Sequence, residues 1–129
     1  MRILVCGGRD YDDSRAVWRA LDRIKSRGDL ALIIHGDARG ADRLADHYAE
    51  TEGIPVLRFP ADWERDGKAA GPMRNQRMLD EGRPDGVIAF PGGRGTADMI
   101  ARAERAGVRV WRPEAEAVAE AMRKRSGQD

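Results

Sequence analysis

The sequence has little cysteine, few aromatic residues and almost no lysine. Its single cysteine, Cys6, excludes an internal disulfide and a cysteine zinc cluster. Aromatic residues make up 5 % of the chain, which argues against an extended base-stacking groove for single-stranded nucleic acid. No apolar run approaches the roughly 18 residues that a membrane span requires. Residues 1–5 are too short for the apolar region of a signal peptide, so we expect a cytoplasmic protein without a membrane partner.

The charges are nearly balanced, with 23 basic and 22 acidic residues and a formal net charge of +1. A general polyanion binder usually has a basic excess, so we expect no nucleic-acid partner. Of the 23 basic residues, 20 are arginine and 3 are lysine. This excess has two explanations. One is the codon usage of a GC-rich genome, and the other is a need for planar, forked donors that bind phosphate.

The 129 residues fit one compact domain, which we place at 1–129 with its last few residues frayed. Apolar runs alternate with amphipathic patterns along the chain, and residues 60–71 show little periodicity. Strands are predicted at 3–6, 30–35, 56–59, 86–90 and 108–111, and helices at 14–27, 41–52, 72–81, 97–106 and 115–122. This alternation predicts an α/β fold, a Rossmann-like three-layer sandwich of about five parallel strands with helices on both faces.

Three glycine-containing turns follow the first, second and fourth predicted strands, and should meet at the carboxyl edge of the sheet. The first turn contains Gly7, Gly8 and Arg9, which suit either a ligand contact or a tight turn with a solvated arginine. It is not the dinucleotide fingerprint, because a third glycine does not open the helix at the required spacing.

The second turn runs from 35 to 42 and contains Gly36, Asp37, Gly40 and Asp42. Asp42 can complement the dipole of the following helix, or it can accept a hydrogen bond from a ribose hydroxyl. We expect His35 to make a structural hydrogen bond and His47 to be exposed to solvent. Two histidines this far apart, with one cysteine, do not make a metal site, and we expect neither a metal nor a cofactor.

The turn after the fourth predicted strand, residues 91–96, which we call the fourth turn, carries the most specific local pattern: Gly92, Gly93, Arg94, Gly95 and Thr96. Three glycines free the backbone amides before a helix, Thr96 adds a hydroxyl as the expected N-cap, and the helix dipole adds partial positive charge. The turn therefore predicts a phosphate site. It is not a Walker A loop, because Gly-Lys-Ser/Thr does not follow.

The helix predicted from Pro72 carries Arg74, Asn75 and Arg77. The two arginines lie three residues apart and share a face, where they can be solvated or can bind phosphate. Trp63, in the preceding irregular stretch, can stack on a base or can pin the loop to the body.

Together, the motifs at 7–10, 35–42, 71–75 and 91–96 resemble the SLOG superfamily, most closely its YspA-type (cpYpsA-related) branch. The resemblance covers residues 2–111. It implies a Rossmann-like fold that binds nucleotides or nucleotide-derived ligands at the carboxyl edge of its sheet. More distantly, the chain resembles the Lonely Guy (LOG) phosphoribohydrolases and the DprA/Smf proteins.

The LOG enzymes cleave the N-glycosidic bond of nucleoside 5′-monophosphates, and their loop reads Pro-Gly-Gly-x-Gly-Thr-x-x-Glu. Residues 91–96 match that loop, and Arg74, or otherwise Arg77, matches the catalytic arginine of those enzymes. Position 99 is Met instead of Glu, and Asp98 lies one residue earlier, about 100° away around a helix. The departure weighs against hydrolysis, because a carboxylate would stabilise the oxocarbenium-like centre.

The sequence therefore predicts a protein that binds a nucleotide-like small molecule. An N-glycosidase acting through Arg74 and Asp98 is one version, a sensor without turnover is an alternative, and single-stranded DNA handling is a third. A homo-oligomer, with Arg39 or Arg94 acting across an interface, stays open. The expected phosphate- and nucleotide-binding residues are Gly7, Gly8, Arg9, Gly36, Asp37, Gly40, Asp42, Arg74, Asn75, Arg77, Gly92, Gly93, Arg94, Gly95 and Thr96.

Overall fold

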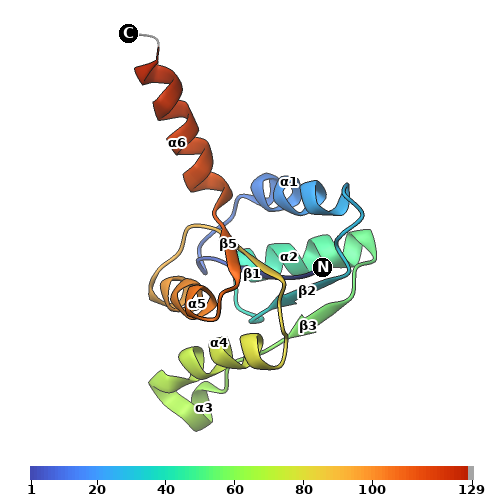
Figure 1. Ribbon diagram of the computed structural model, residues 1–129. Helices are drawn as coiled ribbons and strands as arrows, with labels where there is room; N and C mark the ends of the chain where they lie inside the picture. The colour runs from blue at the N-terminus through green and yellow to red at the C-terminus, as the bar shows by residue number, and fades with distance from the viewer. Residues whose placement is uncertain (128–129) are drawn as a thin grey trace.

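The chain folds around a five-stranded parallel sheet, seen in a computed structural model that describes residues 1–127 (Figure 1). The strand order is β3-β2-β1-β4-β5. The strands are β1 (Arg2–Cys6), β2 (Leu32–His35), β3 (Val56–Arg58), β4 (Gly86–Ala89) and β5 (Arg109–Trp111). The helices are α1 (Ser14–Lys25), α2 (Ala41–Glu52), α3 (Trp63–Asp66), the 3-10 turn η1 (Gly67–Ala69), α4 (Ala70–Asp80), α5 (Arg94–Arg105) and α6 (Pro113–Ser126).

Helices cover both faces of the sheet, which confirms the predicted three-layer Rossmann-like sandwich. Alternate residues of β1 point to opposite faces, as the strand period of two requires. Val5 packs with α1 and α2 on one face, and Leu4 packs with α4 and α5 on the other. Because both faces are covered, β4 is buried along its whole length, as its continuous apolar run predicts.

The strand order reverses next to β1. The chain builds β1, β2 and β3 outward in one direction, then returns to place β4 on the other side of β1. In open α/β sheets, this reversal leaves a crevice at the carboxyl ends of the two strands on either side of it. The first and fourth predicted turns follow those two strands, at Cys6 and Ala89.

Two predicted element boundaries were wrong. Residues 60–71, expected to be irregular, contain α3 and η1, and α4 begins at Ala70 instead of Pro72. The N-cap of α5 is Gly93, so Thr96 is the third residue of the helix and not its cap. The helix starts earlier because the Pro-Gly-Gly turn is completed before Arg94, and this shift brings the amides of residues 94–96 into the first helical turn.

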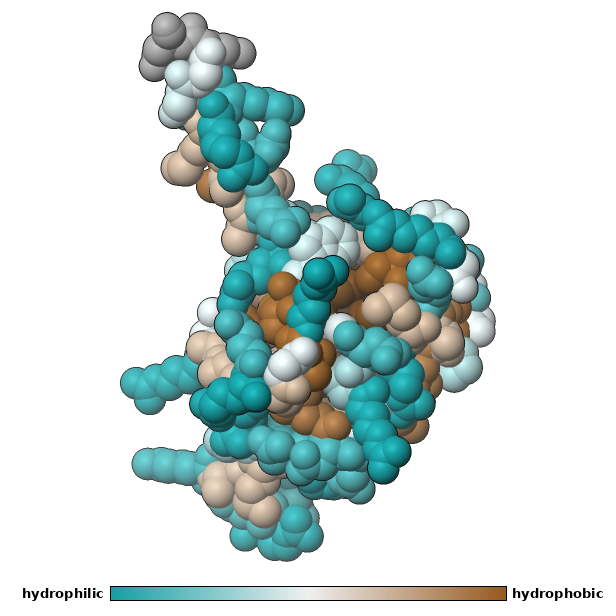
Figure 2. All heavy atoms as spheres, in the orientation of Figure 1, coloured by the Kyte–Doolittle hydropathy of each residue, from teal (hydrophilic) through white to brown (hydrophobic). Residues whose placement is uncertain are grey.

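Helix α6 leaves the body of the protein, as Figure 1 and Figure 2 both show. None of its residues is buried, and Val118 and Met122 are largely exposed. Its first turn is tied down by a hydrogen bond from the Tyr11 hydroxyl to Glu114 and one from Trp111 Nε1 to Glu116 at 2.7 Å. The predicted fraying of the last residues concerns in part residues 128–129, which lie outside the described part. Among residues 1–127, there is no helix long and apolar enough to cross a membrane.

Candidate functional site: a cleft at the carboxyl edge of the sheet

The three glycine-containing turns meet at one cleft of about 670 Å³ beside the switch in strand order. The turn after β1 contributes Gly7, Gly8 and Arg9, and the turn after β2 contributes Ala38 and Asp42. The fourth turn and the start of α5 contribute residues 93–96, and α4 closes the remaining side with residues 71, 72, 74, 75 and 78. The volume lies within the range of about 300–1,000 Å³ that is typical of small-molecule sites.

Several of the glycines are required by close packing between the turns. A Cβ atom on Gly7 would lie 2.6 Å from the Cβ of Ala41. Gly40 has a φ of +77°, and a Cβ there would lie 2.0 Å from the carbonyl oxygen of Gly8. The Gly8 amide donates to the carbonyl of Pro91 at 2.8 Å, which joins the first turn to the fourth. These contacts set the shape of the cleft. They explain why Gly7 and Gly40 are glycine, without any role in ligand binding.

Gly93 and Gly95 are different, because a Cβ atom at either position would meet nothing within 4 Å. Neither has a positive φ, so backbone conformation does not demand glycine. Both line the cleft and are exposed. Within residues 1–127, the amides of Arg94, Gly95 and Thr96 donate to no other group, as expected for the first turn of a helix. Glycine at 93 and 95 therefore leaves this part of the cleft, beside three amides without partners, free of side chains.

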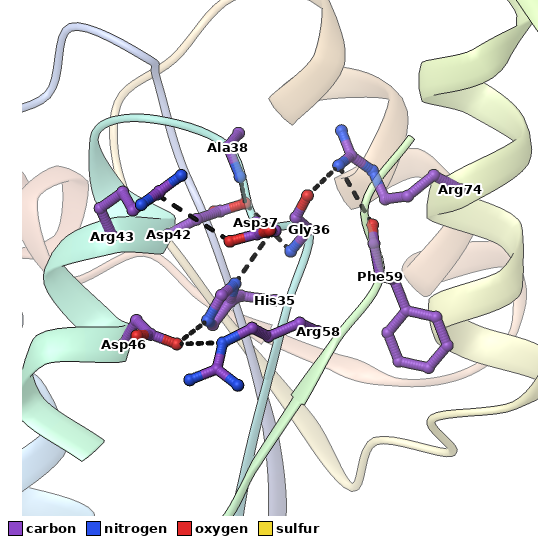
Figure 3. Close-up of polar contacts among 10 residues, drawn as sticks. All are labelled: His35, Gly36, Asp37, Ala38, Asp42, Arg43, Asp46, Arg58, Phe59 and Arg74. Carbon is purple, nitrogen blue, oxygen red and sulfur yellow. Dashed lines mark hydrogen bonds and ion pairs between the residues drawn. The ribbon is translucent and has the colours of Figure 1, made fainter. Parts of the chain in front are cut away.

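Arg74 is held rigidly at the opposite wall by backbone carbonyls (Figure 3). Its Nη1 donates to the carbonyl of Gly36 and, at 3.5 Å, to that of Phe59, while Nε donates to Asn75 Oδ1 at 3.1 Å. A Cβ atom on Gly36 would collide with the Arg74 guanidinium. Burial lowers the pKa of Arg74, yet an arginine keeps its charge at any physiological pH. The Nη2 group makes no hydrogen bond within the described residues and is left to contact a ligand.

Asn75 and Asp98 connect the two walls of the cleft. Asn75 Nδ2 donates to the carbonyl of Gly95 at 3.1 Å and to Asp98 Oδ2 at 3.0 Å, and Arg102 Nε donates to the same Oδ2 at 2.8 Å. Partial burial would raise the pKa of Asp98, but the hydrogen bonds from Arg102 and Asn75 outweigh it and hold the pKa below its usual value. Asp98 is therefore an ionised carboxylate at the cleft wall. Met99, at the LOG glutamate position, is buried in the core.

Asp42 anchors the turn after β2 instead of capping α2. Its Oδ2 accepts from the amides of Gly36 at 3.0 Å and Ala38 at 3.2 Å, and the N-cap of α2 is Gly40. Burial raises the pKa of Asp42, against the opposing effects of the hydrogen bonds from the Ala38 and Gly36 amides and of the charge of Arg74. Asp42 is among the residues that line the cleft, and its Oδ1 makes no hydrogen bond within residues 1–127, so the turn contact and a ligand contact are compatible.

His35 is fully buried beneath this turn and has a structural environment (Figure 3). Its Nδ1 accepts from the Asp37 amide at 2.9 Å, so Nε2 carries the proton and donates to Asp46 at 2.8 Å. Arg58 donates to the same carboxylate oxygen at 2.8 Å. Burial would raise the pKa of Asp46, but the hydrogen bonds from Arg58 and His35 outweigh this effect and lower the pKa. The network braces Asp37, a residue other than glycine with a φ of +56°.

Ten of the fifteen predicted binding residues line the cleft, and five do not: Gly36, Asp37, Gly40, Arg77 and Gly92. Arg77 is turned away from the cleft by its own contacts. Its Nε donates to Glu81 at 2.7 Å, and its guanidinium lies over the Phe59 ring. Sequence reasoning did not anticipate that Arg9 stacks on Trp63, with the guanidinium carbon 5.3 Å from the ring centroid. It also missed Cys6 on the cleft floor, where burial raises the pKa of the thiol to about 12.

The described residues contain no cluster of three or more His, Cys, Asp or Glu side chains that could hold a metal ion. The donors around the cleft are amides, guanidinium groups, the Lys68 ammonium, the Trp63 indole and the Thr96 hydroxyl, which makes no hydrogen bond within residues 1–127. Such a set of donors suits an anion.

The sheet and its cleft define a Rossmann-like α/β protein with an anion-suited crevice at the strand-order switch. Comparison with known proteins narrows this class. The family whose model matches residues 1–65 is described as the YspA, cpYpsA-related SLOG family. The Gene 61 protein of Mycobacterium phage D29 is 41 % identical over 117 residues, which cover 84 % of this chain and 93 % of that protein. The chain belongs to the YspA, cpYpsA-related SLOG family, as the motifs predicted.

Among solved structures, the X-ray structure of DNA processing protein A (DprA) from Streptococcus pneumoniae shares the fold, with a TM-score of 0.50 and 16 % sequence identity. The match covers 85 % of this chain, which spans only 58 % of the length of that structure. At this identity, the likeness extends to the fold alone.

Proposed function

We propose that the cleft binds a nucleotide or a nucleotide-derived ligand, with its phosphate on the amides of Arg94, Gly95 and Thr96. One observation carries the proposal: the cleft-lining residues Arg94, Gly95 and Thr96 have amides that donate to no other group within residues 1–127, and nothing in the protein fills the space that a side chain at Gly93 or Gly95 would take. The helix dipole of α5 adds partial positive charge at the same point. The Thr96 hydroxyl and Arg74 Nη2 supply further donors.

The rest of the cleft suits the remainder of a nucleotide. Gly7 and Gly8 form a side-chain-free wall that a ribose can approach, and Asp42 Oδ1 can accept from a ribose hydroxyl. Trp63, which is 49 % exposed at the rim, provides an aromatic surface. Arg9 and Arg94 add positive charge to the rim.

Hydrolysis of an N-glycosidic bond is a second candidate, favoured by the ionised carboxylate of Asp98 at the cleft. Held by Asn75 and Arg102, it could stabilise an oxocarbenium-like centre, but it has no proton to donate to a departing base. Binding without turnover requires neither a catalytic carboxylate nor a proton donor. The sensor alternative therefore depends on fewer assumptions, and we take binding as the primary activity.

Titration calorimetry with the four ribonucleoside 5′-monophosphates tests the proposal. Thr96→Val keeps the shape of the side chain and removes its hydroxyl, so we expect about fivefold weaker binding from the loss of one hydrogen bond. Thr51→Val, on the exposed surface of α2, is the matched control and should bind as the wild type does. No saturable heat with any of the four nucleotides would refute the proposal.

The same samples separate binding from turnover. Chromatography after incubation detects a released base, which we expect only if Asp98 acts, and Asp98→Asn should then abolish its release while retaining nucleotide affinity. Titration with a short single-stranded oligodeoxynucleotide covers the DNA alternative. Salt-sensitive binding of the oligonucleotide, without binding of any mononucleotide, would favour it.

A further inference from the structure

A second cavity, of about 290 Å³, adjoins the cleft beside the turn after β2. We name it the arginine lobe, because four arginines line it: Arg9, Arg39, Arg43 and Arg74. Arg9 and Arg74 also line the main cleft, so the lobe and the cleft share part of their walls. Figure 3 shows Arg43 from α2 and Arg74 from α4 reaching the 36–38 turn from its two sides.

The positive charge of the arginine lobe is poorly compensated. Against the four guanidinium groups stands one lining carboxylate, Asp37, whose Oδ1 lies 3.9 Å from Arg43 Nε. Within residues 1–127, Arg9 and Arg39 form no ion pair, and the Arg43 pair with Asp37 is a long one. In a chain whose net charge is +1, this is a local concentration of positive charge without internal partners. Such concentrations attract anions.

The residue type and rigidity of the lobe also suit an anionic group. A guanidinium presents planar, forked donors that match phosphate and carboxylate oxygens, which the point charge of lysine does not. Arg74 is fixed by two carbonyls, and Arg9 by its stack on Trp63. Burial lowers the pKa of Arg74 and the charge of Arg9 lowers it further, with partial relief from Asp42, so an added anion would ease a repulsion already present.

We propose that the arginine lobe is a second anion subsite, and that the ligand is a nucleotide with two separated anionic groups, in chemical class a nucleoside bisphosphate. One phosphate lies on the amides of α5 and the other lies in the lobe. Arg9, Trp63 and Arg74 line both cavities, so a single ligand can place one anionic group in each. This inference rests on the proposed function of the cleft.

The test compares each ribonucleoside 5′-monophosphate with its 3′,5′-bisphosphate by calorimetry. We expect the bisphosphate of at least one nucleoside to bind about tenfold more tightly than its monophosphate, because it gains two guanidinium contacts. The double variant Arg39→Gln/Arg43→Gln should remove this advantage and leave monophosphate affinity within about twofold. Both side chains are exposed, so the fold should persist. Arg15→Gln/Arg19→Gln on α1 removes the same charge elsewhere and is the matched control.

Each other outcome overturns the inference. If monophosphates bind but bisphosphates gain nothing, the arginine lobe is not a subsite, and the proposed function of the cleft stands. If the two double variants weaken both ligands equally, the effect is net charge alone. If an oligodeoxynucleotide binds more tightly than any bisphosphate through Arg39 and Arg43, the lobe serves nucleic acid instead. If neither nucleotide class binds, the proposed function fails as well.

Discussion

Replacement of Gly95 by alanine and by leucine should change stability and binding in opposite directions. Gly95 is the second residue of α5, and a Cβ atom there would meet nothing in the protein. Alanine and leucine are better helix formers than glycine, so we expect each variant to be more stable by about 0.5 kcal/mol. For a chain of this size, that gain corresponds to a rise in Tm of about 2 °C.

The effect on binding follows from the direction of the added side chain. In a helix, the Cα–Cβ bond tilts toward the N-terminus, so a leucine at 95 would cover the amides of the first turn. Loss of two charge-assisted hydrogen bonds, at about 1.5 kcal/mol each, would weaken nucleotide binding about 100-fold. Alanine covers less and should cost about fivefold. Ala101→Leu, exposed farther along α5, is the control and should bind normally.

Thermal denaturation and calorimetry on these three variants and the wild type test the prediction. Lower affinity together with unchanged or higher Tm cannot arise from a damaged fold, so it would locate the phosphate on these amides. If Gly95→Leu binds nucleotides as the wild type does, the phosphate lies elsewhere. If Tm falls, the space above Gly95 is not open, and the reasoning from the missing Cβ is wrong.

Three further predictions concern the surroundings of the cleft. Burial raises the pKa of Cys6 from 9.0 to about 12, which lowers the thiolate fraction at pH 8 about a thousandfold. The thiol should therefore react with Ellman's reagent only when the protein unfolds, and prompt labelling of the native protein would contradict this prediction. Asp46→Asn should lower the free energy of unfolding by about 1 kcal/mol at pH 7. Because the folded-state pKa of Asp46 is depressed, that contribution is present above the unfolded value of 3.8 and is lost as pH falls through the lower folded-state value. The stabilities of the two proteins in urea melts should therefore converge as pH falls below 3.8, and a gap that stays constant would count against this reasoning. Trp63→Phe should abolish the change in tryptophan fluorescence on nucleotide binding, since Trp63 is the tryptophan that lines the cleft.

The sheet was predictable because its central strands β1, β2 and β4 contain continuous apolar runs, and each main helix of the body has a periodic apolar face. The edge strands β3 and β5 are shorter and include an arginine each. Helix α3 was not predictable, because four residues make about one turn and carry no periodicity. Its start depends on Asp62, whose side chain accepts from the Arg65 amide at 3.1 Å. The tertiary packing of Trp63 against Gly71 and Arg9 then holds it in place.

The glycine pattern identified the turns but not the reason for each glycine. Gly7 and Gly95 look alike in a sequence. At Gly7 a neighbouring residue occupies the space that a side chain would need, whereas at Gly95 that space is open. That difference depends on Ala41, which lies far along the chain. The bridge from Asn75 to Asp98 likewise joins residues 23 positions apart, so only the fold could reveal it.

The hydrogen bonds from Asn75 to α5 have a kinetic consequence. They join the helix that carries Arg74 to the helix that carries the phosphate-binding amides, so the two walls of the cleft are assembled before any ligand arrives. A preorganised site loses little conformational entropy on binding. Association should then be a single exponential whose rate rises linearly with nucleotide concentration in stopped-flow fluorescence. Asn75→Ala, which disconnects the walls, should introduce a slower phase that levels off at high concentration.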